Sequence, residues 1–440
     1  MNASSINTNA SVNKWILFLF CSLLNLRILT ELPRVLRETN WLNTSASNYD
    51  LNRSISFLII LFCSFFILAK RKVIVTLLFF KFASFLFLFL LASCAISIHT
   101  FTSLSMPVTG VFVVLSRFIL ELVLVLFVTN FIRTPDQFQS IFRFFFKPTI
   151  FIFLGISSIQ ILTSSYVEVQ GVYRITGPFG NPNTLASFLH LFIVLTFYYY
   201  GSNRSKLFWF LIIAEYGLLF FTGSIGNILA SLLFILLVAI RQHWLRLKRF
   251  FLVFPVLLSA LIAGIIYKWD SIVNRFSILI NPQSFELTDG SSIKWRIEAW
   301  GHYIDLLGSS VFNWIFGLGI GVQRWMLHPD YSNSQAYIFE APGSHNDYLG
   351  VLVDFGLVGL LLFIFSLAVF SRIIKKAERI DDKLYLLRFY FYTILFVMIS
   401  ENYIDQLIAF IFIIFITSTV TVAFNKSENL QMGSNSALNA

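Results

Sequence analysis

Charged residues are unusually few in this sequence. Only 12% of its 440 residues are Asp, Glu, Lys or Arg, whereas 57% are hydrophobic, and the mean hydropathy is +0.78. A soluble chain carries roughly 25% charged residues, because water must solvate its surface. At half that fraction most of the chain must face lipid, which excludes a soluble enzyme and a disordered protein.

Cysteine is scarce as well. Cys21, Cys63 and Cys94 are the three cysteines and all lie in apolar runs, so we expect neither an extracytoplasmic disulfide nor a cysteine-based metal site. The abundant residue is phenylalanine, with 52 copies. These copies fall in long unbroken apolar runs and do not alternate with polar residues, which argues against an outer-membrane barrel.

The apolar runs predict the fold class. A bilayer core about 30 Å thick requires roughly 20 apolar residues in a helix, which satisfies its own backbone. We therefore expect an all-α polytopic membrane protein with about 12 transmembrane helices. The first run contains Arg27 and is the weakest, but no small-x-small cleavage site follows it, so we interpret it as an uncleaved span. The runs lie near residues 15–30, 54–69, 73–98, 108–131, 149–163, 184–200, 207–222, 226–240, 250–268, 346–370, 385–400 and 406–424.

Lysine and arginine residues are unevenly divided between the loops. Most lie in short loops on one side, and the positive-inside rule places these loops and both termini in the cytoplasm. The net charge of +10 is then mainly a topological signal and gives no reason to expect nucleic acid. The external side carries one long, partly helical loop, residues 269–345, and such loops are usually functional. The chain divides into N-terminal helices (1–170), a central core (171–370) and C-terminal helices with a tail (371–440).

Three external segments contain candidates for chemistry. The first is GVYRITGPFGNPNTL, residues 171–185, where Arg174 precedes a turn-rich path into a helix. Asn183 or Thr184 is expected to cap that helix, and its N-terminus together with Arg174 suits a phosphate group. The simpler interpretation is a helix-entry turn with a snorkelling arginine.

The second segment is SSIKWRIEAW, residues 291–300. Ile293, Ile297 and Trp300 follow an i, i+4, i+7 spacing, which predicts an amphipathic helix lying on the membrane. Arg296 falls near the face opposite the apolar stripe. The simpler interpretation is an interfacial helix with ordinary basic residues.

The third segment combines GLGIG, residues 317–321, with PGSHNDYLG, residues 342–350. The alternate glycines permit tight turns but do not make a nucleotide loop, because no Lys-Ser/Thr follows them. His345 stands at the start of a span, and an imidazole at head-group level is a candidate general base. Asn346 or Asp347 is expected to cap the helix. The simpler interpretation is a solvated histidine in a cap region.

Together these segments fit one kind of reaction. A histidine base and external arginines, with no convincing metal cluster, suit the deprotonation of an acceptor hydroxyl while a lipid pyrophosphate departs. Arginine suits the leaving group because its planar fork binds phosphate oxygens and keeps its charge. Arg174 and Arg296 are the first candidates for this role, and Arg324 is a third.

The order of the motifs resembles the O-antigen ligase and O-antigen polymerase superfamily. The resemblance covers roughly residues 170–365 and rests on R-x-x-G-x-x-x-N-P-N, T-G-S, R-x-x-x-W, a glycine-rich turn and H-N-x-Y-L…G-L-x-G. These motifs lie at residues 174–183, 222–224, 296–300, 317–321 and 345–359.

The resemblance implies a GT-C-like bundle in the bacterial inner membrane, with the long loop in the periplasm. It implies transfer of a glycan from undecaprenyl pyrophosphate to an acceptor, either a lipid A core sugar or a lipid-linked glycan, with inversion and without metal or cofactor. His345 and Arg296 are then catalytic, and Arg174, Arg296 and Arg324 bind pyrophosphate. Asn183 and Asn346 are expected at helix caps on the acceptor side. The partners are these two substrates and membrane lipid; whether the chain is a ligase or a polymerase stays open.

One departure from the family pattern matters. Family members commonly have S-R-G after the T-G, whereas this chain has TGSIGN, with Ile225 in place of the arginine. Either Arg174 or Arg324 supplies the second cation, or activity is altered or lost. An inactive scaffold of polysaccharide assembly is therefore one alternative function.

The other alternative is a flippase or transporter for a lipid-linked sugar. It would use the charges inside the predicted spans. Arg117 and Glu121 are i, i+4 neighbours that can pair on one helix face, and Lys81 and Glu215 are isolated in two other spans.

Overall fold

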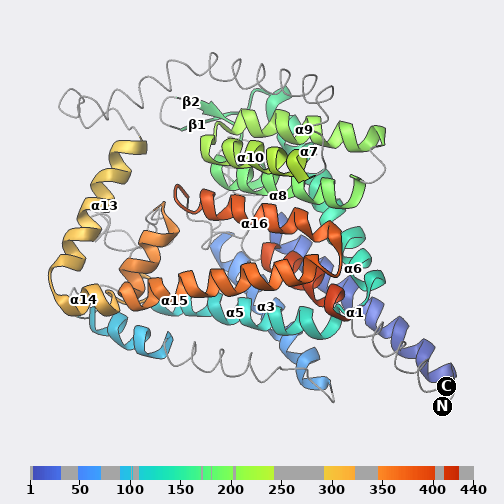
Figure 1. Ribbon diagram of the computed structural model, residues 1–440, viewed down its shortest axis with the longest axis horizontal. Helices are drawn as coiled ribbons and strands as arrows, with labels where there is room; N and C mark the ends of the chain where they lie inside the picture. Colours follow the sequence, from blue (N-terminus) through green and yellow to red (C-terminus); the bar gives the residue numbers. More distant parts are fainter. Residues whose placement is uncertain are drawn as a thin grey trace.

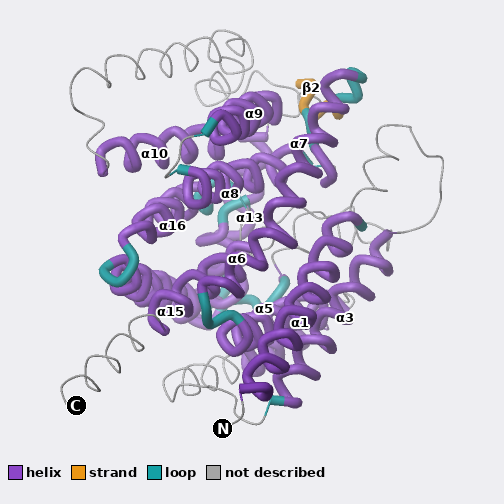
Figure 2. Tube along the Cα trace, turned by 90° about the vertical axis from the view of Figure 1, so that its right-hand side faces the viewer, coloured by secondary structure: helices purple, strands orange, loops and turns teal. Residues whose placement is uncertain are grey.

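The computed structural model describes most of the chain, and over these residues the protein is almost entirely helical (Figures 1 and 2). The described residues are 3–30, 48–70, 90–100, 102, 109–169, 172–179, 181–201, 205–241, 292–322, 345–401 and 411–425.

The N-terminal part begins with the helices α1 (Ala3–Leu29), α3 (Asn48–Ala69), a short helix at Leu90–Thr100, and α5 (Thr109–Phe131). Of these helices, α3 packs against both α1 and α5. Next comes one continuous rod, in which α6 (Pro135–Ile141) passes through a π-helical turn, η1 (Phe142–Phe146), into α7 (Lys147–Leu162). The rod begins well before the predicted start at residue 149, because Thr134 and Gln137 form a capping box and Pro135 occupies the first turn.

The central part begins with a small exception to the expected all-α fold. Strands β1 (Val167–Val169) and β2 (Val172–Arg174) form an antiparallel hairpin in which Val167 pairs with Arg174. The elements that follow are η2 (Gly177–Phe179), α8 (Pro182–Tyr200), α9 (Lys206–Thr222), α10 (Ile225–Arg241), α13 (Ser292–Gly308) and α14 (Val311–Phe316).

The C-terminal part is dominated by one long helix with a break. Helix α15 (Asp347–Glu378) has non-helical backbone angles at Gly356. We call the short piece before this break, residues 347–355, the outer piece, and the longer piece after it, residues 357–378, the inner piece. After it come η7 (Asp382–Leu384), α16 (Tyr385–Val397) and a helix at Ile411–Asn425. In Figure 1 the break separates the two orange pieces of α15, and α13 and α14 lie beside the outer one.

Two hydrophobic cores hold these helices together. The larger core is rich in phenylalanine and is centred on α8, whose side chains from Leu185 to Phe197 are all buried. Helices α9, α10 and α16 pack around α8, as Figures 1 and 2 show. The smaller core joins α13, residues 317–322 and the outer piece of α15.

The described helices fit an integral membrane protein. Pro135–Leu162 and Asp347–Glu378 are long and apolar enough to cross a bilayer, and five shorter apolar helices accompany them in the described part. The number of about 12 spans stays a prediction. The predicted run 250–268 lies outside the described residues, and of the run 73–98 only residues 90–98 are described.

Candidate functional site

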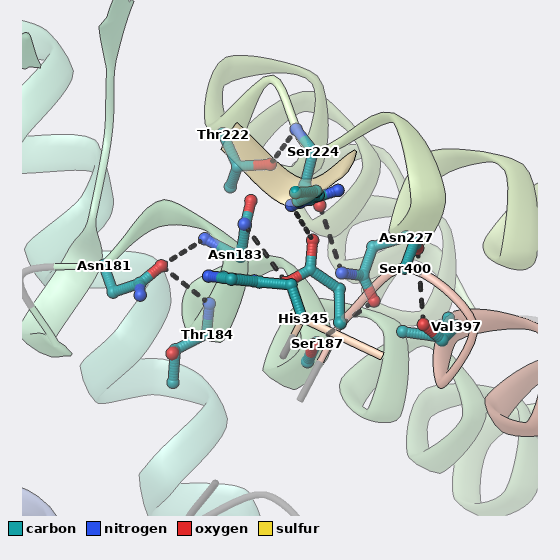
Figure 3. Close-up of polar contacts among 12 residues, drawn as sticks. Asn181, Asn183, Thr184, Ser187, Thr222, Ser224, Asn227, His345, Val397 and Ser400 are labelled. Atoms are coloured by element: carbon teal, nitrogen blue, oxygen red, sulfur yellow. Dashed lines mark hydrogen bonds and ion pairs between the residues drawn. The ribbon is translucent and has the colours of Figure 1, made fainter. Parts of the chain in front are cut away.

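Glu401 is the centre of the candidate site. Its carboxylate lies just after α16 and is 5% exposed. The Oε1 atom is 3.7 Å from Nη2 of Arg296, and the Oε2 atom is 3.5 Å from Nδ1 of His345. Asn183 donates a hydrogen bond of 3.2 Å from Nδ2 to the same Oε2. Three segments far apart in the sequence therefore meet on one buried carboxylate; Figure 3 shows Asn183 and His345 facing each other there.

The start of α8 brings Asn183 to this point. The cap of α8 is Asn181, whose side-chain oxygen accepts from the backbone N–H groups of Asn183 and Thr184. The expectation that Asn183 or Thr184 caps the helix was therefore wrong. Pro182 lacks an N–H group and occupies the first helical position, so the cap is Asn181, two residues before Asn183. This arrangement leaves the Asn183 amide available for Glu401.

His345 is held by the start of α15. It has a positive φ of 48°, which is uncommon for a residue other than glycine. Asn346 caps α15 by accepting from the backbone N–H of Leu349. The backbone N–H of Asp347 donates to the carbonyl of Met398, at 2.9 Å. The end of α16 therefore fixes both Glu401 and the backbone beside His345.

Arg296 reaches the site from α13. The predicted helix at 291–300 is present and continues to Gly308, because Tyr303 and Leu307 are completely buried in the smaller core. The Arg296 side chain is 19% exposed, and its Nε makes no hydrogen bond to any residue that the structure describes. Its position on the membrane surface stays a prediction.

Arg174 lies at the end of β2 and is buried, with an exposure of 6%. Its Nε lies 3.4 Å from the place where a Cβ atom on Gly223 would stand. Gly223 is the T-G-S glycine and has a φ of 63°. Gln160 of α7 holds the segment that follows β2, since its Oε1 accepts from the backbone N–H groups of Thr176 and Gly177.

The T-G-S-I-G-N segment connects Arg174 to the neighbourhood of Glu401. Ser224 accepts from the amide of Asn227, and Ser187 of α8 donates to that amide's oxygen (Figure 3). A Cβ atom on Gly226 would lie 2.7 Å from Oγ of Ser400, the residue before Glu401. Ile225, which stands where the family has arginine, is 41% exposed.

The sequence did not single out Glu401 or Gln160. A signal for Glu401 existed: it begins the short polar stretch ENYIDQ between the last two predicted spans, on the predicted external side. Gln160 lies inside an apolar run, and nothing in its spacing indicates that it binds the backbone of residues 176 and 177.

Several other residues with predicted roles are not described by the structure, either as a whole or in their side chains. Arg324, Lys81 and the side chain of Arg117 belong to this group, so the roles and pairings predicted for them stay predictions. Glu215 is described and completely buried, and it accepts a 2.8 Å hydrogen bond from Thr196 of α8. This contact belongs to the packing of α9 on α8.

The fold and the site define a helical membrane protein with a polar cluster of arginine, histidine and glutamate at one end of its bundle. Residues 207–364 match the family model described as O-antigen ligase, and this match confirms the resemblance of this part of the chain to the O-antigen ligase and polymerase superfamily. The match covers fewer than half of the residues; it includes Arg296 and His345, whereas Arg174, Asn183 and Glu401 lie outside it. No curated protein matches the chain.

Proposed function

We propose that the protein transfers a glycan from undecaprenyl pyrophosphate to the hydroxyl of an acceptor sugar, at the periplasmic face of the bacterial inner membrane. The match of residues 207–364 to the O-antigen ligase family model supports a role in glycan transfer. The observation that carries the proposal is the convergence of Arg296 and His345 on Glu401. An oriented imidazole and a guanidinium beside one carboxylate are suited to a base and a phosphate ligand.

His345 is the proposed general base. Glu401 lies on the Nδ1 side of its imidazole, at 3.5 Å. A carboxylate in this position favours the tautomer with a proton on Nδ1, and it stabilises the imidazolium ion that forms during transfer. The Nε2 atom is then the acceptor of the proton from the sugar hydroxyl.

The reaction is proposed as one displacement. The acceptor oxygen gives its proton to Nε2 of His345 and forms a bond to the anomeric carbon of the donor sugar. The bond from this carbon to the pyrophosphate oxygen breaks, so the sugar inverts its configuration. Negative charge develops on the leaving pyrophosphate, and fixed cations that face it lower the barrier.

Arg296 is the first proposed ligand of the pyrophosphate. Its guanidinium carries several N–H donors, of which Nη2 faces Glu401 while Nε makes no hydrogen bond to a described residue. It can therefore keep its contact with Glu401 and still donate to a phosphate oxygen. Arg324 stays a candidate for the same role.

Arg174 is the proposed substitute for the arginine that Ile225 replaces. It is buried against Gly223, beside the position where the family arginine would stand. The β1–β2 hairpin and Gln160 hold the backbone around this side chain. The second cation is then an arginine of β2, Arg174, and not one at position 225 at the start of α10.

The proposal includes the wider assignment. The chain is a GT-C-like, metal-independent enzyme with both termini in the cytoplasm, and its acceptor is a lipid A core sugar or another lipid-linked glycan. Chain-length analysis of the surface polysaccharide in a deletion strain separates the two acceptors. Loss of all attached glycan indicates a ligase, and retention of a single repeat unit indicates a polymerase.

A His345→Ala variant tests the proposed function against the alternatives. After its insertion in the membrane is verified, the lipid-linked donor and the finished glycan are measured together. We expect the donor to accumulate in the external leaflet while the finished glycan disappears. A donor trapped in the inner leaflet of the deletion strain, with His345→Ala fully active, would instead show a flippase. Wild-type protein with no transfer activity on any donor and acceptor would support an inactive scaffold.

A further inference from the structure

The break in α15 is built around a second segment of the chain, which we call the glycine turn (residues 317–322). The turn follows α14 and lies against residues 353–356. Each segment has a glycine at the point of contact, Gly317 in the turn and Gly356 in the break. A Cβ atom on Gly317 would stand 2.6 Å from the carbonyl carbon of Asp354, and a Cβ atom on Gly356 would collide with the carbonyl oxygen of Ile315. Gly317 and Gly356 also have positive φ angles, of 80° and 65°.

Backbone hydrogen bonds join the turn to the break. The N–H of Leu318 donates to the carbonyl of Val353 at 2.8 Å, and the N–H of Gly319 donates to the carbonyl of Asp354 at 3.0 Å. Carbonyl groups near a helix break lose their normal helical hydrogen-bond donors. The N–H groups of the turn replace these donors for the carbonyls of Val353 and Asp354. The break in α15 is therefore stabilised by contacts from outside the helix.

One side chain adds to this backbone contact. The Oδ2 atom of Asp354 accepts a 3.0 Å hydrogen bond from the backbone N–H of Gly321, and Asp354 is 4% exposed. Asp354 therefore holds the turn by both its carbonyl and its carboxylate. The opposite side of the turn is held by hydroxyl groups of the Leu90–Thr100 helix, since Ser97 donates to the carbonyl of Ile320 and Thr100 donates to that of Leu318.

The turn is also joined to the two helices that carry the site residues. Tyr303 and Leu307 of α13 share the smaller core with Leu318 and Ile320 of the turn and with Val353 of α15. Arg296 lies seven residues before Tyr303, and His345 lies nine residues before Asp354, which correspond to roughly 10 and 13 Å along a helix. Both residues then meet at Glu401.

We infer that Asp354 is a positioning residue for transfer. It ties the turn at the end of α13–α14 to the outer piece of α15, and this connection sets where Arg296 and His345 stand relative to each other. The inference rests on the proposed function. In this role Asp354 acts through the two helices, by its contacts with the glycine turn.

The test compares three variants of the full-length protein in lipid nanodiscs. Asp354→Leu removes the carboxylate, Asp354→Asn keeps an oxygen that can accept from Gly321, and Thr100→Val loosens the turn from its other side. Two readouts are used: transfer kinetics well below the melting temperature, and amide hydrogen exchange of the peptides covering 317–322 and 345–353. Exchange reports the connection itself and does not require activity.

We expect Asp354→Leu to lower kcat by about tenfold or more, because small displacements of reacting groups are costly. The KM for the donor should change by less than about twofold, since the loss falls on the transition state. Exchange should accelerate in both peptides. Asp354→Asn should recover most of kcat, and Thr100→Val should accelerate exchange in 317–322 alone and keep the wild-type kcat.

Three results would overturn the inference: a folded Asp354→Leu variant with wild-type kcat, equal losses of kcat in Asp354→Leu and Thr100→Val, or unchanged exchange in 345–353. An inactive wild-type protein would refute the proposed function instead. In that case the exchange pattern alone still decides whether Asp354 connects the turn to the start of α15.

Discussion

The Nδ1 atom of His345 lies 3.5 Å from the Oε2 atom of Glu401, and these two residues stand at the start of one helix and just past the end of the next. The hydrogen bond from Asp347 to Met398 joins the same two helix ends through the backbone. The imidazole and the carboxylate are therefore held by a common support. Their relative position is set by two helix ends that contact each other.

We expect Glu401→Gln to abolish most of the transfer activity. Glutamine keeps the size of the side chain and an oxygen for Asn183, but it removes the negative charge that faces Arg296 and His345. By comparison with the loss of the carboxylate in catalytic triads, the rate should fall roughly 100-fold or more. The measurement is the transfer rate in proteoliposomes with purified donor and acceptor.

The matched control for this variant is Glu378→Gln. Glu378 is also a mostly buried carboxylate, and it pairs with Arg388 at 2.9 Å far along α15 from the site. Its loss should lower the melting temperature and leave the transfer rate near that of the wild type. Equal rates for the two variants would remove Glu401 from the proposed mechanism.

We expect Arg174→Ala to lower the transfer rate by roughly 100-fold, because a fixed cation at the leaving group is lost. Arg174→Lys should retain part of the rate, since the charge stays and the planar fork does not. The decisive variant combines Arg174→Ala with Ile225→Arg, which returns an arginine to the family position. Recovery of activity in this double variant supports substitution of one cation for the other, whereas an unchanged rate in normally expressed Arg174→Ala refutes it.

Asn181 and Asn183 provide a contrast between stability and function. Asn181→Ala removes the cap of α8 and should lower the free energy of unfolding by about 1 kcal/mol. Asn183→Leu instead keeps a side chain of similar size and leaves the Asn181 cap in place, but it removes the hydrogen bond to Glu401. We expect it to reduce transfer strongly with a small change in melting temperature. Thermal denaturation and kinetics on the same samples distinguish the two effects, and similar behaviour of both variants would contradict this assignment.

We expect Gly356→Ala to destabilise the protein by more than the roughly 1–2 kcal/mol that a left-handed conformation costs a residue with a side chain. The added methyl group would also meet the carbonyl of Ile315. Gly155→Ala is the control, because no atom lies within 4 Å of its added Cβ and the position is helical. It should stabilise the protein by about 0.5–1 kcal/mol. Melting temperatures in detergent check both expectations; a Gly356→Ala protein as stable as wild type would show that the break in α15 does not require glycine.

The sequence revealed those parts of the site that lie in local motifs. Arg296 was found from the spacing of its helix, and His345 from its place at the start of a span. Glu401 was missed because its importance arises only when α16 ends beside α15, and a hydropathy pattern contains no information about which helix ends meet. The break at Gly356 was missed for a related reason. Residues 346–370 are mostly apolar and predict one span, whereas the break at Gly356 is stabilised by a turn that lies more than 30 residues earlier in the chain.

The break also separates the part of α15 that is long enough to cross a membrane from the part that lies next to His345. Residues 357–378 alone measure roughly 33 Å along the helix, which is enough to cross a hydrocarbon core of about 30 Å. The nine residues before Gly356 are therefore surplus to the crossing, although any count of apolar residues includes them in the same span. They form a short arm that begins beside His345 and, because of the break, takes a different direction from the span that follows. A change in membrane thickness would then be absorbed by this span without moving the imidazole away from Glu401.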